Sequence, residues 1–159
     1  MKKLTPQQFL THTMQMQSAM EDAKKKAVFV GLPKEKVGGE VYGDGMTIIR
    51  NGAIHEFGAG NIPQRSFLRV PFQTKRKELN AGIAKQFELM IDKGNSVIVA
   101  LGRIGLIAEN VSRGAFTSLG YGTWKPSTPA TNRRKGSSQT LVDTGTLKGS
   151  ITSVVRNVT

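Results

Sequence analysis

The chain has 159 residues, a length that suits one domain with a sizeable core and is too short for two. Its 23 basic and 11 acidic residues give a formal charge of +12, which favours polyanionic partners such as nucleic acid, acidic lipid or an acidic protein surface. The absence of cysteine excludes disulfides and thiolate metal sites. The polar start is unlike a signal peptide and no apolar run approaches the length of a membrane span, so we expect no membrane and a cytoplasm-like compartment.

The first predicted element is an amphipathic helix within residues 1–27. Thr5 or a neighbour can cap it with Pro6 in the first position, and apolar residues recur at steps of three, four or seven as far as Ala27. Lys24, Lys25 and Lys26 close the helix, where cations are favourable. These lysines are either a solvated helix end or a patch that contacts DNA.

Short strand signals and glycine-rich turns follow the helix. Val28–Leu32 reads as a strand, and residues 33–45 read as a hairpin or a mobile loop. Met46–Arg50 is a candidate second strand, because an Asn51-Gly52 turn signal comes directly after it.

Two further helices are predicted from apolar periodicity. One spans roughly Thr74–Lys93 and is closed by Gly94, and the other spans about Ser96–Leu119. Gly102 and Gly105 weaken the first turns of the second helix.

Beyond residue 119 the sequence changes character. Residues 120–139 are rich in Gly, Pro, Ser, Thr and Arg without periodicity, which predicts an extended arm or loop. Residues 140–159 read as a turn followed by a strand within Leu147–Val158. We therefore expect a single α+β domain over 1–159, in which two to three amphipathic helices pack on a small mixed or antiparallel sheet. The sheet and two of the helices lie within 28–119.

Candidate catalytic groups are weak. Asp143-Thr-Gly145 follows an apolar pair, as in dimeric aspartic proteases, but too few residues follow it to build the rest of such a subunit. Asp143 is better read as the cap of a turn or short helix, with Gly145 supplying a permissive backbone. His55 has only His12 as a fellow histidine, and no metal-binding spacing exists. We expect no enzyme, no metal and no cofactor.

A compact cassette joins Glu56-Phe-Gly58 to Ile62-Pro-Gln-Arg-Ser-Phe-Leu-Arg69. In it Arg65 and Arg69 flank Phe67 and Leu68, a combination common at protein interfaces. The alternative is that Phe67 and Leu68 belong to the core. Truncation of Phe67 to Ala would then cost about 3–5 kcal/mol, whereas loss of an interface anchor would leave the monomer folded.

A second cluster is basic. Arg133, Arg134 and Lys135 lie in the predicted arm beside Gly136 and have no interleaved aromatic residues. Any nucleic-acid contact there would be to phosphates and without sequence preference.

The first cassette resembles the "EFG … P-x-R-x-F-L-R" block of tailed-phage neck and tail-completion proteins, also called virion-morphogenesis proteins. The second half of the chain is similar to the same family. Its matching residues are Trp124-Lys-Pro, Pro129-Ala-Thr131, Arg134-Lys-Gly136 and Leu141-Val-Asp-Thr-Gly-Thr-Leu-Lys-Gly-Ser-Ile151. The resemblance covers about residues 28–158, with two amphipathic helices between the blocks.

This resemblance implies a non-enzymatic virion protein at the junction between phage head and tail, assembled in the host cytoplasm. Its partners would be further copies of itself in a ring, expected to be a hexamer with a dodecamer as the alternative. An adjacent head-closure or connector ring and the tail-terminator or tail-tube proteins would also be partners. Genomic DNA would pass through the lumen and be contacted without sequence preference, which suits a basic chain.

The resemblance and the local patterns together assign the candidate residues. The residues expected at a subunit or ring interface are Glu56, Phe57, Gly58, Pro63, Arg65, Phe67, Leu68, Arg69 and Trp124. The residues expected to fix the turn into the final strand are Asp143, Thr144, Gly145 and Leu147. The residues expected to contact DNA in the lumen or an acidic partner are Lys24, Lys25, Lys26, Arg133, Arg134 and Lys135.

Two other functions stay open. One is a tail terminator that caps the tail tube, and the other is a small basic protein that binds nucleic acid without specificity. The second predicts tight, salt-sensitive DNA binding by the monomer, whereas a ring subunit binds DNA weakly until it is assembled.

Overall fold

The computed structural model describes residues 5–136, 138–141 and 145–158. Its elements in chain order are α1 (Pro6–Lys24), β1 (Lys26–Gly31), α2 (Lys34–Val37), α3 (Ile48–Phe57), α4 (Arg69–Thr74), α5 (Arg76–Lys93), α6 (Val97–Gly114), α7 (Pro129–Lys135), α8 (Thr146–Gly149) and β2 (Thr152–Asn157). The predicted α+β class is confirmed, with helices around one small sheet.

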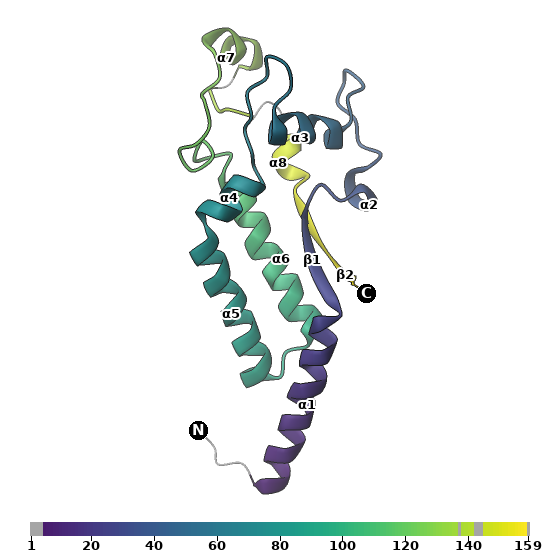
Figure 1. Cartoon of the computed structure of the whole chain (residues 1–159). Coiled ribbons are helices and arrows are strands. Elements are labelled where there is room, and N and C mark those ends of the chain that lie inside the picture. The colour runs from purple at the N-terminus through teal and green to yellow at the C-terminus, as the bar shows by residue number, and fades with distance from the viewer. Residues whose placement is uncertain (1–4, 137, 142–144, 159) are drawn as a thin grey trace.

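The sheet is a two-stranded antiparallel ribbon. Lys26 pairs with Asn157 at one end and Gly31 with Thr152 at the other, and the ribbon lies along α6 (Figure 1). Val28 and Val155 face each other in this register and pack against the apolar side of α6. The predicted strand at Val28–Leu32 is confirmed in position by β1. The predicted strand within Leu147–Val158 is confirmed only in its second part, because Leu147–Gly149 belong to the short helix α8.

Helices α5 and α6 form an antiparallel pair beside the ribbon (Figure 1). Gly94 ends α5 in the left-handed conformation, as predicted, with φ of 65°. Ser96 caps α6 by accepting a hydrogen bond from the Val99 amide at 3.3 Å. The helix ends at Gly114, before the predicted Leu119, and is followed by turns in which Leu119 and Tyr121 have positive φ.

Two apolar clusters form the interior. One lies where α3, α8 and the end of α6 meet, and its buried residues are Ile48, Phe67, Ala115, Phe116, Trp124, Leu147 and Ile151. The other lies between α5, α6, the ribbon and the base of α1, and its buried residues are Met90, Val97, Ala100, Leu101 and Ile104.

Helix α1 projects from one end of the molecule (Figure 1). The predicted N-cap is confirmed, since the Thr5 hydroxyl accepts from the Gln8 amide and the Gln8 side chain accepts from the Thr5 amide. No residue of α1 is buried. In the described part of the chain, no helix is both long and apolar enough to cross a bilayer.

One local prediction was wrong and a second was only partly right. Met46–Arg50 is not a strand, because Thr47 caps α3 by accepting from the Arg50 amide and Gly52 lies inside that helix. The predicted arm or loop over residues 120–139 is only partly right: residues 120–128 form no helix or strand, but helix α7 begins after the N-cap Thr128.

Candidate functional site

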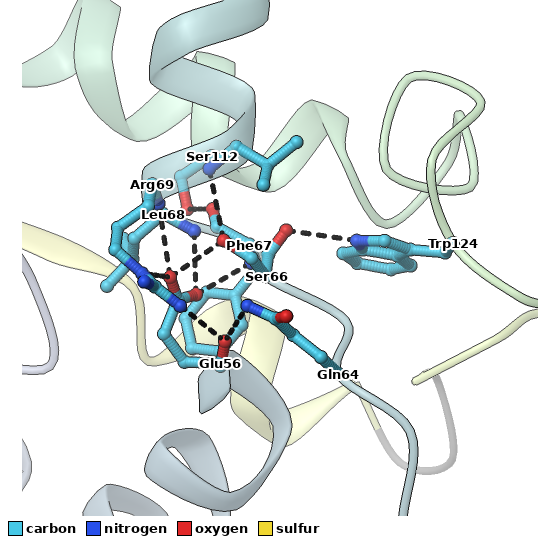
Figure 2. Close-up of polar contacts among 9 residues, drawn as sticks. Glu56, Gln64, Ser66, Phe67, Leu68, Arg69, Ser112 and Trp124 are labelled. Carbon is cyan, nitrogen blue, oxygen red and sulfur yellow. Dashed lines mark hydrogen bonds and ion pairs between the residues drawn. The ribbon is translucent and has the colours of Figure 1, made fainter. Parts of the chain in front are cut away.

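The most connected polar group in the described structure is the carboxylate of Glu56, near the end of α3. It is 4 % exposed. One oxygen accepts from the Ser66 hydroxyl at 2.7 Å and from Nε of Arg69 at 3.1 Å, while the other accepts from the Phe67 and Leu68 amides at 2.8 and 3.0 Å. The Arg69 amide adds a fifth donor at 3.2 Å (Figure 2). We call this arrangement the Glu56 clasp.

The clasp ties α3 to the start of α4. The first amides of a helix have no partner within the helix, and an anion placed there accepts their hydrogen bonds and interacts favourably with the helix dipole. The Glu56 carbonyl also accepts from the Gln64 side chain at 3.2 Å and from the Arg69 guanidinium at 3.1 Å. The loop between the helices is therefore folded back onto the end of α3.

Gly58 allows this return. Its φ is 79°, and a Cβ there would lie 3.2 Å from the Gln64 amide nitrogen. A residue with a side chain would be strained by the backbone conformation and would crowd the returning loop.

The clasp is also joined to the rest of the fold. Ser112 of α6 donates to the Phe67 carbonyl at 2.7 Å, and the Trp124 indole donates to the Ser66 carbonyl at 2.9 Å (Figure 2). The Phe67 and Phe116 rings are 5.6 Å apart, and the Trp124 ring meets Phe116 edge-on at 5.4 Å. The cassette around Glu56 and the segment around Trp124 thus meet through the Trp124–Ser66 hydrogen bond and the shared ring of Phe116.

Arg65 is held inside the chain. It is 8 % exposed, its amide donates to the His55 carbonyl at 2.8 Å and its Nε donates to the Lys125 carbonyl at 3.0 Å. Burial lowers the pKa of the Arg65 guanidinium. Its role in this structure is to bring residue 125 to the end of α3.

His55 lines a cavity of about 460 Å³ together with Arg65 and Arg134. Burial, and then the positive charge of Arg65, lowers the pKa of His55 from 6.5 to about 4. Its Nδ1 is buried and has no hydrogen-bond partner among the described residues. The imidazole is therefore neutral at pH 7. The described residues contain no cluster of three His, Cys, Asp or Glu side chains able to hold a metal ion.

One edge of the clasp faces solvent. Phe57 is 63 % exposed, and the Arg69 guanidinium lies over its ring at 4.6 Å from the centroid. Pro63 is also exposed. This aromatic–cation pair is the part of the cassette that can meet another molecule directly.

The residues expected at an interface therefore divide into three groups by their exposure. Phe57, Pro63 and Arg69 are exposed, and Gly58 and Leu68 are half-buried. The remaining members of the set lie in the interior of this chain; they are Glu56, Arg65, Phe67 and Trp124. In this structure the buried group builds the loop that carries the exposed one.

The expected turn residues lie partly outside the described structure. Asp143 and Thr144 fall outside the described residues. Gly145 has a left-handed backbone, with φ of 80°, and Leu147 is buried in the first apolar cluster.

The expected basic contacts do not form one patch. Lys24 and Lys25 are exposed where α1 meets β1, whereas Lys26 is half-buried and pairs with Asp22. Arg133 and Arg134 are exposed on α7, which lies far from α1 in Figure 1. Lys135 is the last residue of α7, and its side chain is not among those that the structure describes.

The sequence did not predict the roles of Ser66 in the clasp or of Gln64 and Ser112, which bond to the backbone around it. Ser66 carries a local signal, since its hydroxyl accepts from the Val70 amide in the first turn of α4. Ser112 carries none, because its partner is the carbonyl of Phe67 on another element.

Comparisons with known proteins found no relative of this chain. Neither the scan against protein-family models nor the searches of curated proteins and solved structures found a match to this chain.

Proposed function

We propose that this chain is a non-enzymatic subunit of a ring at the head–tail junction of a tailed phage, where it joins the tail to the DNA-filled head. The proposal starts from the resemblance of its two sequence blocks to neck and tail-completion proteins. Within that role, tail completion and tail termination are variants of one structural task.

The observation that carries the proposal is the convergence of the two blocks on one core. Glu56 and Phe67 belong to the first block, and Trp124, Leu147 and Ile151 to the second. Several residues of the family-like pattern thus belong to the core of this fold, which supports reading the two blocks as one structural unit. They also present Phe57 and Arg69 at the surface, where an aromatic residue and an arginine suit a protein interface.

The charge of the chain supports passage of DNA. A ring of six copies would carry a formal charge of 6 × 12 = +72, from the +12 of each chain. Contacts between such a ring and DNA phosphates are electrostatic and independent of sequence.

The test is electron microscopy of lysates from a phage that encodes this chain and carries a stop codon in its gene. We expect filled heads beside separate, otherwise normal tails, and recovery of joined particles when the purified protein is added. Intact infectious particles without the protein would contradict the proposal.

The second candidate is a nucleic-acid-binding protein that acts as a monomer. The same +12 charge and the exposed Arg133 and Arg134 favour it. Tight, salt-sensitive binding of free duplex DNA by the monomer, together with a phage that assembles without the protein, would favour this candidate over the ring.

A further inference from the structure

The outer part of α1 is an exposed helix without charge. Residues 6–20 contain no Lys, Arg, Asp or Glu, although the whole chain carries +12. The same stretch exposes large apolar side chains: Phe9 is 63 % exposed, Met14 62 %, Leu10 50 % and Met20 41 %. Solvated helices normally carry charges on their open faces, so this surface is unusual for a helix that stays in water.

The helix is attached to its own subunit at one end only. Ala19 and Ala23 pack on the second apolar cluster, near Met90 and Val97. Their seam continues outward at steps of three or four residues through Met16 and His12, which are half-buried and line the groove beside the α5–α6 turn, to the exposed Phe9. The outer part of α1 projects away from the rest of the described chain (Figure 1).

A second uncharged apolar surface lies at the start of α6. Residues 96–102 contain no charged side chain, and within them Ile98 is 53 % exposed and Val99 43 %. It adjoins the groove between α1 and the α5–α6 turn, which Met16, Met90 and Val97 help to line. Each copy thus carries a projecting apolar helix and, near its base, an apolar face.

Electrostatics favours a second copy as the occupant. Two chains of +12 repel each other over most of their surfaces, so they approach closely at less cost where both surfaces lack charge. DNA is disfavoured because residues 6–20 offer phosphates no cation. A membrane surface is disfavoured because helices that lie on lipid carry Lys and Arg on the polar face.

We propose that residues 6–20 of one copy pack against the start of α6, at Ile98 and Val99, of a second copy. The projecting helix and the face that receives it are two different surfaces of the same chain, so each copy can bind one neighbour through each surface. Such a head-to-tail contact can be repeated from copy to copy until a ring closes. The inference deepens the proposed function and rests on it for its biological setting.

The absence of cysteine makes a direct test possible. The variants Phe9→Cys and Ile98→Cys are purified separately, mixed at high concentration and oxidised. We expect a disulfide-linked dimer between the two variants that neither variant forms alone. A dimer from Phe9→Cys alone would mean symmetric pairing of α1 helices and would overturn the proposal, as would the absence of any cross-link.

Uncross-linked protein supplies the second measurement, sedimentation over a range of concentrations. Phe9→Asp with Met14→Asp should weaken self-association at least about tenfold. These changes should leave Trp124 fluorescence unaltered, since α1 contributes nothing buried. Val41→Asp is the matched control, because Val41 is 59 % exposed on the loop before α3 and should leave association unchanged. Equal weakening by the control, or a wild-type chain that stays monomeric at every concentration, would overturn the proposal.

Failure of this inference is distinguishable from failure of the proposed function. A monomeric chain whose loss still separates heads from tails would retain the neck role and remove the α1 interface. A chain that associates through α1 in a phage that assembles without it would do the opposite.

Discussion

The Glu56 carboxylate is shielded from water, so protein donors must take the place of the lost hydration. Five hydrogen bonds from residues 66–69 do so, and Arg69 adds the compensating charge. Such a group fixes the geometry of its surroundings, because every donor needs the same acceptor in the same place.

Replacement of Glu56 should therefore destabilise the whole fold. Glu56→Gln turns one oxygen into a donor that faces other donors, and Glu56→Ala leaves all five without an acceptor. We expect a loss of about 2–5 kcal/mol in the free energy of unfolding. Urea unfolding followed by the fluorescence of Trp124, the single tryptophan, measures it directly, since that indole is bonded to Ser66.

Glu88→Gln provides the control. Glu88 is exposed and pairs with Lys85 on the surface of α5, and such pairs contribute little. We expect a change within about 0.5 kcal/mol. Comparable losses from the two substitutions would show that burial of Glu56 does not matter.

His55 predicts a pH dependence of stability. Its pKa is about 4 in the folded chain, below the ordinary value of 6.5. The unfolded chain takes up the proton near pH 6.5, so the stability contributed by neutral His55 is complete above pH 6.5 and is lost as the pH falls toward 4. Between pH 7 and 5, wild type should lose about 1 kcal/mol more than His55→Gln, a value reduced for solvent screening of the half-buried ring. Parallel stability curves for the two proteins would contradict the prediction.

At the scale of elements, α6 is the helix on which both strands, α1, α4 and α5 pack. Its apolar side contacts both strands, α5 and the base of α1. Gly105 permits the close approach of β2: a Cβ there would lie 2.4 Å from Ser153 Oγ and 2.9 Å from Ser153 Cβ. Ser153 has little freedom to move away, because its hydroxyl donates to Glu109 at 2.7 Å.

Two glycines of α6 should therefore respond to alanine with opposite signs. Gly105→Ala crowds Ser153, and we expect a loss of about 1–3 kcal/mol. Gly102→Ala meets no atom within 4 Å, so the better helix propensity of alanine should stabilise the chain by about 0.5–1 kcal/mol. Urea unfolding of both variants is the measurement. If both substitutions stabilised the chain, the close approach of β2 to α6 at Gly105 would not contribute to stability.

The elements that sequence predicted well are those whose signals are local. α5 and α6 are long, periodic and capped by Gly94 and Ser96, so no distant residue is needed to predict them. α3 was missed because Gly52 looks like part of a turn. In the fold, Gly52 allows α3 to pack closely on Leu32, because a Cβ at residue 52 would lie 2.4 Å from Leu32 Cδ1. The reason for a glycine at this position is therefore a contact with a residue distant in sequence.

The same limit applies to the site. The cassette around Glu56 stood out in the sequence, but its charged and aromatic residues predicted an interface rather than a buried clasp. Composition cannot distinguish the two, since Glu, Arg and Phe serve both. The burial of Glu56 depends on Ser112 and Trp124, whose proximity only the folded chain provides.

For the whole molecule, positive charge is spread over separated elements rather than gathered on one face. Arg133 and Arg134 on α7 are an adjacent exposed basic pair, and Arg76 and Lys77 on α5 are another. If Arg133 and Arg134 line a DNA passage, their removal should alter the salt dependence of binding more than removal of the same charge elsewhere.

The prediction uses two double variants of equal charge. Arg133→Gln with Arg134→Gln should reduce the slope of log K against log salt by about 0.9 for each phosphate that is no longer neutralised, roughly 2 for the pair. Arg76→Gln with Lys77→Gln, both exposed on α5, should leave the slope nearly unchanged. Fluorescence anisotropy with a short duplex measures both. Equal slopes would mean that DNA responds to total charge and not to α7.

The ribbon has a consequence for the order in which the molecule forms. β1 precedes α2 and β2 follows α8, so the two strands pair across nearly the whole described chain. Closing so long a loop has a large entropic cost, and pairings of this kind slow folding. During synthesis β1, with Phe29 and Val30, has to wait without its partner until residues 152–157 are made. Over that interval it is an unpaired apolar strand that can aggregate, which makes the rate of folding in the cell depend on the last strand to appear.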